Sequence, residues 1–449
     1  MQLPSFLLNS LANARGFDKE AFEQVHASGE QVTSIRLNPA KPVTQFPNSS
    51  IANSKIPWTE YGYYLNERPS FTFDPLFHAG CYYVQEASSM FVEQALRQTV
   101  DLSKPLKVLD LCASPGGKST HIQSLISKES LLASNEVIRS RANVLKDNII
   151  KWGCENVVVT NNDPKDFTRL KNYFDVIVVD APCSGSGLFR RDPEAIEEWS
   201  ENNVQLCSQR QQRILADVWP ALKKEGILIY STCSYSKEED EDIVGWLLEE
   251  RSAVQCSLTV NSSWGIIESG GGYRFWPDKV KGEGFFLACF KKTDGEETAS
   301  MKFKSKPDAA TKKDIEMLAR WIKMEGLQFV KHLTTVYAWP QHLATDFSFL
   351  LDNLRVIYSG VLAGELMRDK LVPDHSLAMS LLVTEEVPHV ALNYEQAIQY
   401  LQRKDVQLQG AAKGWQLMTY DSCPLGWANV LPNRVNNYYP REMRILKDN

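Results

Sequence analysis

The feature that most constrains the fold is a series of apolar runs that alternates with helix-type stretches between residues 106 and 290. Five runs are almost wholly apolar, and a sixth follows them: 106–111, 131–136, 157–159, 175–180, 226–230 and 285–290. Strands without polar alternation are buried on both faces, and the stretches between them have helical patterns at 121–127, 140–152, 204–222 and 236–249. This order predicts an α/β fold with a doubly wound, Rossmann-like parallel sheet.

The flanking regions differ from this central part. Residues 34–39 indicate a short strand ended by Pro39, and residues 84–96 look helical. An acidic stretch followed by lysines around Pro307 is typical of a linker, and helix periodicity resumes at 315–324. The predicted domains are an N-terminal segment, a core, a linker and two α+β units: 1–75, 76–293, 294–313, 314–386 and 387–449.

Composition excludes several classes of protein. The 449 residues are 43% hydrophobic, which excludes a disordered polyelectrolyte. Lys and Arg number 49 against 55 Asp and Glu, for a net charge of −6, so any nucleic-acid contact needs a local basic patch. The nine cysteines form no CxxC, which argues against a zinc knuckle or a disulfide framework and favours a reducing compartment. We expect a cytoplasmic monomer without a metal ion or a membrane span, and a helix rather than a signal peptide over residues 1–17.

The loop after the first core strand predicts a cofactor site. It runs Cys112-Ala113-Ser114-Pro115-Gly116-Gly117-Lys118, and its glycines allow a ligand close to the backbone. Gly117-Lys118 mimics the end of a phosphate-binding P-loop, but that motif needs glycine where Cys112 stands, and Pro115 removes an N–H. Acidic residues after the next strands, Glu136 and Asp163, suit the ribose and the adenine of S-adenosylmethionine better. The alternative is a purely structural role, in which the glycines only turn the chain and bind no ligand.

Two cysteines follow two neighbouring core strands. Cys183 lies after the strand ending at Asp180, and Cys233 lies in Ser231-Thr232-Cys233-Ser234 after the next. Each alone is more typical of a small buried hydrophobe, but together they are expected side by side above the sheet. A cysteine pair suits carbon 5 of a pyrimidine, which becomes nucleophilic once a thiolate adds to carbon 6. Asp180 is placed to serve ring nitrogen 3 of a cytosine. Spacing alone does not decide which cysteine attacks.

The segment after Cys233 carries a further prediction. Ser236 and Glu239 have the spacing of a capping box, which places a helix N-terminus three residues beyond Cys233 and favours its thiolate through the helix dipole. The negative charges of the acidic run 238–242 disfavour a thiolate at Cys233 unless these side chains face solvent. Lys118 or the pair Arg190 and Arg191 are candidates to offset it.

Taken together, these motifs resemble the Fmu/Sun family of RNA (cytosine-5) methyltransferases, and most closely its RsmF-type branch, which modifies small-subunit ribosomal RNA. The resemblance spans essentially the whole chain. It rests on segments at 82–89, 112–118, 135–136, 180–185, 190–193, 230–234 and 282–286, and on 426–441 for a PUA-like domain. One departure is Asp240, where the family usually has asparagine.

The resemblance implies a class I methyltransferase core with S-adenosylmethionine as cofactor. It implies that Cys233 is the nucleophile and that Cys183 assists release, whereas DNA cytosine-5 enzymes use the cysteine of the Pro-Cys motif. It also implies cofactor binding by residues 112–118, Glu136, Asp163 and Asp180. The expected product is 5-methylcytosine in 16S ribosomal RNA, and the expected partner is RNA or the small ribosomal subunit.

RNA contacts need basic and aromatic side chains. The candidates are Arg190 and Arg191 beside the active-site loop, Arg36 and Asn38 near the N-terminus, and four residues near the C-terminus: Arg434, Tyr438, Tyr439 and Arg441. We expect a confined positive face, with acidic surfaces elsewhere. The alternative functions are methylation of transfer RNA, a non-catalytic ribosome-assembly role and a P-loop nucleotide hydrolase.

Overall fold

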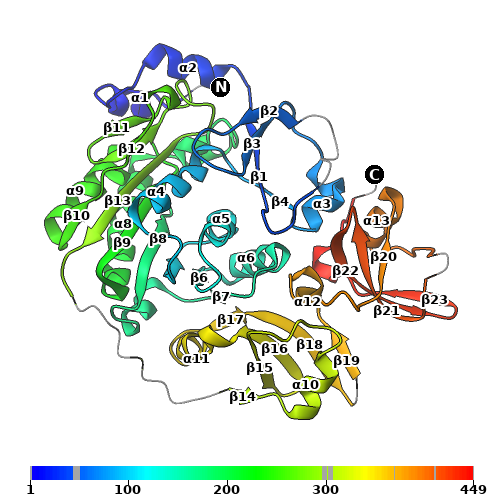
Figure 1. The fold of residues 1–449 in the computed structure, drawn as a ribbon. Coiled ribbons are helices and arrows are strands. Elements are labelled where there is room, and N and C mark those ends of the chain that lie inside the picture. The colour runs from blue at the N-terminus through cyan, green and yellow to red at the C-terminus, as the bar shows by residue number, and fades with distance from the viewer. Residues whose placement is uncertain are drawn as a thin grey trace.

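The computed structural model describes residues 3–43, 51–295, 301, 307–368, 370–408 and 411–447. Half of the predicted linker, residues 296–300 and 302–306, lies outside the described residues. The chain forms a large central sheet flanked by three smaller sheets (Figure 1). No helix in the described ranges is both long and apolar enough to cross a bilayer.

The central sheet confirms the predicted α/β fold. Its strand order is β11-β12-β13-β9-β8-β5-β6-β7-β17, and the five strands from β9 to β7 are parallel. The antiparallel strand β13 adds to β9. The strand bounds are β5 Lys107–Asp110, β6 Leu131–Asn135, β7 Val157–Thr160, β8 Phe174–Asp180, β9 Leu222–Thr232, β10 Ala253–Gln255, β11 Ile267–Ser269, β12 Gly272–Phe275 and β13 Phe285–Lys292.

Both faces of this sheet are buried, which explains why its strands are apolar throughout. Leu109 and Ile177 point into one core, while Val108 and Val176 point into the other. Each core is completed by the crossover helices, as the alternation of the sequence predicts. The helices of this part are α4 Val92–Thr99, α5 Gly117–Leu125, α6 Arg139–Trp152, α7 Ala195–Glu198, α8 Glu201–Val218 and α9 Glu241–Glu250.

The N-terminal region forms its own antiparallel sheet, of order β2-β3-β1-β4. The predicted strand before Pro39 is confirmed as β1. The helix expected over 84–96 starts only at Val92, because Val84 belongs to a strand and the Glu86 carboxylate accepts from the N–H groups of Ser88 and Ser89 to form a turn. The elements are α1 Ser5–Leu11, α2 Lys19–Ala27, β1 Thr33–Leu37, β2 Ile51–Lys55, β3 Gly62–Leu65, α3 Pro75–His78 and β4 Tyr82–Val84.

The C-terminal part holds two further sheets, of order β14-β15-β16-β18-β19 and β20-β21-β22-β23. One strand, β17, leaves them and pairs antiparallel with β7, which covers that edge of the central sheet. The elements are β14 Asp308–Ala309, α10 Lys312–Leu318, β15 Leu327–His332, β16 Thr335–Pro340, α11 Ala344–Asn353, β17 Val356–Ser359, β18 Val361–Met367, β19 Lys370–Pro373, α12 His375–Met379, β20 His389–Ala391, α13 Tyr394–Leu401, β21 Gly414–Tyr420, β22 Cys423–Leu431 and β23 Arg434–Asn437.

The N-terminal sheet packs against the last unit of the chain. Ile35 and Tyr82 of the N-terminal sheet share one apolar core with Tyr400, Leu425 and Tyr439 of the last unit. Figure 1 shows α3 beside β22 and α13 accordingly. The first and last units therefore form a continuous body on one side of the central sheet.

Candidate active site

The loop after β5 lies at the carboxyl end of the central sheet. Asp110 ends β5 in full burial, which raises the pKa of its carboxyl to about 7, and it accepts a hydrogen bond of 2.6 Å from Ser119 Oγ. Gly116 has φ +116°, a conformation that disfavours side chains, and it is the N-cap residue that precedes helix α5. The loop therefore turns directly from the strand into the helix, as a ligand-binding βα turn requires.

The larger of two cavities opens beside this loop and has a volume of about 570 Å³. Glu136 follows β6 and Asp163 follows β7, and both line it. Glu136 is almost fully buried, and its Oε1 accepts from Ile138 N at 2.9 Å. Asp163 Oδ1 accepts from Lys165 N at 3.1 Å. We call this space the carboxylate cavity; its lining includes Cys112, Ser114, Asn135, Glu136, Val137, Ile138, Asp163, Pro164, Asp180, Cys183 and Cys233.

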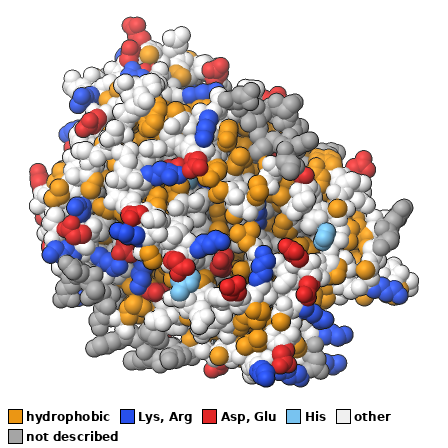
Figure 2. Space-filling view, in the orientation of Figure 1, with side chains coloured by type: hydrophobic (Ala, Val, Ile, Leu, Met, Phe, Trp, Pro, Cys, Tyr) orange, Lys and Arg blue, Asp and Glu red, His pale blue; other side chains and the backbone are white. Residues whose placement is uncertain are grey.

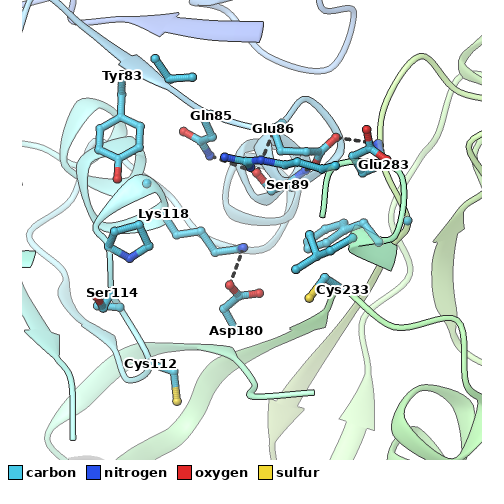
Figure 3. A pocket seen from close by; sticks show the side chains of 18 residues that line it. Tyr83, Gln85, Glu86, Ser89, Cys112, Ser114, Lys118, Asp180, Cys233 and Glu283 are labelled. Carbon is cyan, nitrogen blue, oxygen red and sulfur yellow. Dashed lines mark hydrogen bonds and ion pairs between the residues drawn. The ribbon is translucent and has the colours of Figure 1, made fainter. Parts of the chain in front are cut away.

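The smaller cavity, about 320 Å³, lies on the other side of Asp180. We call it the lysine cavity, because Lys118 projects across it (Figure 3). Its remaining lining includes Tyr83, Gln85, Glu86, Ser89, Asp180, Arg191, Cys233, Glu283, Gly284 and Phe285. The two cavities share five lining residues, namely Cys112, Ser114, Asp180, Leu188 and Cys233. Two ligands placed in them would therefore meet at Asp180 and Cys233.

Lys118 and Asp180 form an ion pair across the lysine cavity. Their Nζ and Oδ2 atoms are 2.9 Å apart, as the dashed line in Figure 3 shows. The other oxygen, Oδ1, accepts from Ser231 Oγ at 2.8 Å. Lys118 Nζ also lies 5.1 Å from the centre of the Phe285 ring. These contacts fix a carboxylate and an ammonium group beside Cys233.

The structure brings together the two cysteines that the sequence singled out. Cys183 Sγ and Cys233 Sγ are 3.0 Å apart. Cys233 lines both cavities, whereas Cys183 lines only the carboxylate cavity. The hydrogen bond with Cys233 and burial together raise the pKa of the Cys183 thiol well above its usual range. Cys183 thus holds its proton and can donate it to the sulfur of Cys233.

The loops that carry these sulfurs are packed against each other. Gly187 N donates to Cys233 O at 2.9 Å, and a Cβ on Gly187 would meet that oxygen at 2.7 Å. The glycine therefore permits the close approach that brings the sulfurs together.

The predicted helix N-terminus near Cys233 is wrong. The Ser236 side chain caps nothing, and only a short 3-10 turn follows it. The α-helix α9 starts at Glu241, after Asp240. The capping box fails because the Glu239 side chain turns inward and accepts from Ser184 and Ser234. A dipole from α9 is therefore too distant to stabilise a thiolate at Cys233.

The expectation that Arg36 and Asn38 contact RNA is also wrong. Arg36 is fully buried, and its guanidinium donates to the side chains of Gln85 and Thr120 and to the carbonyl of Gly117. Asn38 donates to the carbonyls of Gly80 and Trp152. Both side chains join the N-terminal sheet to the core, which leaves them no open face.

The expectation that Arg190 and Tyr439 contact RNA is wrong for the same reason, since both are buried. Arg190 is buried, donates to the carbonyls of Gly282 and Glu30, and lies 3.7 Å from Glu283. Tyr439 is fully buried against Tyr400. Basic and aromatic residue types alone do not distinguish such internal positions from surface ones.

The remaining candidates are exposed: Arg191 beside the lysine cavity, and Arg434, Tyr438 and Arg441 on the last unit. On the face that Figure 2 draws, basic and acidic side chains are interspersed, and neither sign covers a large area. The confined positive face expected from the net charge stays a prediction. Within the described ranges, no group of three or more His, Cys, Asp or Glu side chains has the arrangement of a metal site.

Several residues of the lysine cavity are not predicted from the sequence. Tyr83, Gln85 and Glu86 come from the end of the N-terminal sheet, and Glu283 comes from the loop before β13. Figure 3 shows them along the rim opposite Asp180. The only signal for them was that their segments, 82–89 and 282–286, belong to the family resemblance.

Comparison with known proteins covers nearly the whole chain. Residues 3–87, 97–291 and 387–445 match family models described as the N-terminal domain of 16S rRNA methyltransferase RsmF, 16S rRNA methyltransferase RsmB/F and the methyltransferase RsmF PUA domain. The chain is 30% identical to the ribosomal RNA small subunit methyltransferase F of Shewanella woodyi over 440 residues, 92% of this chain and 89% of that one. It is 28% identical to the protein of the same name from Shewanella amazonensis over 465 residues, which cover 99% of this chain and 98% of that one. A solved methyltransferase homologue from Pyrococcus horikoshii is 25% identical with a TM-score of 0.52, and the match covers 65% of this chain and all of that one.

Proposed function

The chain belongs to the RsmF-type family of ribosomal RNA small subunit methyltransferases, and from this premise we propose that it methylates carbon 5 of a cytosine in 16S ribosomal RNA through a covalent bond to Cys233. The protein is an rRNA methyltransferase with S-adenosylmethionine as its cofactor. Beyond this activity, we propose which base is methylated, at which atom, and what each residue of the site does. The observation that carries it is the pair of sulfurs 3.0 Å apart where the two cavities join.

The carboxylate cavity fits S-adenosylmethionine by the chemistry of its donors. Glu136 and Asp163 supply acceptors for ribose hydroxyls and an adenine amino group, and Val137, Ile138 and Pro164 supply apolar contact for a ring. The loop of residues 112–118 approaches from the other side. When bound, S-adenosylmethionine supplies an electrophilic methyl group.

The lysine cavity is proposed to receive the cytosine, turned out of its RNA stack. The Cys233 thiolate adds to carbon 6, so that a sulfur–carbon bond forms and the electron pair of the 5,6 double bond moves to carbon 5. The proton that leaves the Cys233 thiol passes through the Asp180 carboxylate to ring nitrogen 3, and the Lys118 ammonium orients that carboxylate. Carbon 5 becomes nucleophilic only in this adduct.

Release requires loss of the proton on carbon 5 and elimination of Cys233. Hydrogen bonding to Cys233 is the main reason why the pKa of Cys183 is raised. Once Cys233 is bound to carbon 6, that hydrogen bond is gone, so the pKa of the Cys183 thiol falls and the thiol can lose its proton to solvent and become a thiolate. We assign the Cys183 thiolate to this step: it takes the proton from carbon 5, the 5,6 double bond reforms, the sulfur–carbon bond breaks, and Cys233 leaves as a thiolate.

RNA is proposed to reach the site over the N-terminal segment and the PUA domain. Arg191 is exposed at the mouth of the lysine cavity, where it can meet a phosphate. Arg434 and Arg441 are exposed on the last unit, and the N-terminal unit shares a core with it. Together they offer a surface that extends from the last unit to the site.

The test is methylation of 16S ribosomal RNA by the Cys233→Ala protein. We expect methyl transfer to vanish while S-adenosylmethionine still binds, since the sulfur adds to the base and the carboxylate cavity stays intact. Cys256→Ala, at a half-buried thiol outside both cavities, is the matched control and should keep full activity. Bisulfite mapping of the product locates the modified base. Retained activity of the Cys233 variant, or a product with the methyl group on another atom, would refute the proposal.

A further inference from the structure

One buried carboxylate joins the two loops that carry the cysteines. Glu239 Oε1 accepts from the backbone N–H of Ser184 at 2.8 Å, and Oε2 accepts from Ser184 Oγ at 2.5 Å. Oε2 also accepts from Ser234 Oγ at 2.6 Å. Ser184 follows Cys183 directly, and Ser234 follows Cys233. A single side chain is thus bonded to the next residue of each cysteine, across 50 positions of sequence.

The surroundings make this link rigid. Glu239 has no exposed surface, and Gln211 of α8 donates from Nε2 to its Oε1 at 3.3 Å and to Pro182 O at 3.1 Å. The Glu239 carbonyl accepts from Tyr230 OH at 2.6 Å. Burial raises the pKa of this carboxyl, and the donors from Ser184, Ser234 and Gln211 act against that rise. The donors therefore hold Glu239 as an acceptor, which is the role of the ionised form.

Glu239 lines neither cavity, so it is not placed to touch RNA or S-adenosylmethionine. Its negative charge does act on the Cys183 sulfur, because it contributes to the raised pKa of that thiol. Two separate effects follow from one residue. It fixes the distance between the sulfurs, and it favours the protonated form of Cys183.

We infer that Glu239 is a positioning residue of this active site, which clamps Ser184 to Ser234 so that Cys183 faces Cys233. The expected effect on catalysis rests on the proposed function. The hydrogen bonds of Glu239 and its effect on the pKa of Cys183 do not depend on that function. The spacing of the two cysteines along the chain is not enough for the chemistry, since misplacement of about 1 Å costs about 100-fold in rate.

The experiment compares Glu239→Gln with Glu238→Gln, a half-buried neighbour whose side chain lies outside the clamp. For Glu239→Gln we expect kcat for RNA methylation to fall about 100-fold, with KM for RNA changed less than twofold. Alkylation of Cys183, followed against pH by mass spectrometry, should move to lower pH because the carboxylate charge is gone. Glu238→Gln should match the wild type in both assays.

The alkylation assay needs no RNA, so it separates this inference from the proposed function. A Glu239→Gln protein with unchanged kcat, or with lower kcat but an unshifted alkylation profile, would overturn the inference. If the variant does not fold, Ser234→Ala removes one arm of the clamp alone. A loss of about tenfold in kcat supports the inference, and a loss of less than twofold refutes it. Failure of the wild type to form 5-methylcytosine would instead overturn the function.

Discussion

Glu93 of helix α4 is a carboxylate whose removal should weaken the join between the N-terminal unit and the core. It is 2% exposed and lies against three parts of the chain. Thr59 Oγ1 of the N-terminal unit donates to it at 2.7 Å, Arg97 Nε donates at 2.8 Å, and His121 Nε2 of α5 lies at 3.0 Å. Helix α5 also carries Lys118, so this join supports the active site directly.

The magnitude follows from the pKa of Glu93. Burial alone would raise it, but the hydrogen bonds from His121, Thr59 and Arg97 outweigh burial and lower it from 4.5 to about 2. A difference of about 2.5 pKa units corresponds to about 3 kcal/mol in favour of the ionised form. Because the folded pKa is depressed, this stability is present above pH 4.5 and is lost as the pH falls through 2.

The assay is thermal unfolding of the wild type, Glu93→Gln and the control Glu67→Gln, whose side chain is exposed. At pH 7 we expect Glu93→Gln to be less stable by about 3 kcal/mol, or about 6–12 °C in Tm for a cooperative unit of about 200 residues. At pH 3 about 1 kcal/mol of the difference should remain. A difference below about 1 kcal/mol at pH 7, or one that does not shrink with acid, would show that the ionised carboxylate is not what stabilises the join.

Three further predictions concern the site and its surroundings. Cys183→Ala should slow release, so a protein–RNA adduct should accumulate on a denaturing gel; normal turnover without any adduct would remove Cys183 from the mechanism. Arg191→Ala should weaken RNA binding and reduce its salt dependence by about one unit of slope in a log–log plot, and an unchanged slope would exclude a phosphate contact. Burial lowers the pKa values of four histidines to about 3–4 (His26, His78, His121 and His375), so below pH 6.5 each should cost about 1.4 kcal/mol of stability per pH unit, while Asp110, whose pKa is raised to about 7, acts in the opposite direction. His78→Gln should therefore lose less stability than the wild type between pH 7 and pH 5; calorimetry of both proteins checks this, and an equal pH dependence would contradict the burial of His78 as a neutral imidazole.

Sequence alone determined the central architecture. Runs such as 175–180 and 226–230 are apolar throughout because both faces of their strands are buried, and this pattern reports parallel pairing without any knowledge of the partner strands. It also determined that Cys183 and Cys233 share one edge of the sheet, because the carboxyl ends of adjacent parallel strands must lie together. Local turn chemistry placed the loop of residues 112–118 in the same way.

Only the tertiary structure decided which polar groups are used inside the protein. Arg36 and Arg190 have the residue type of RNA contacts, yet each is buried among carbonyls of segments distant in sequence. Glu239 has the spacing of a helix cap, but its carboxylate instead joins two loops that are 50 residues apart. Periodicity and spacing describe neighbours along the chain, whereas the partner of a buried charge is set by which distant backbone groups need a hydrogen bond after packing. That information exists only once the strands, helices and loops have been brought together.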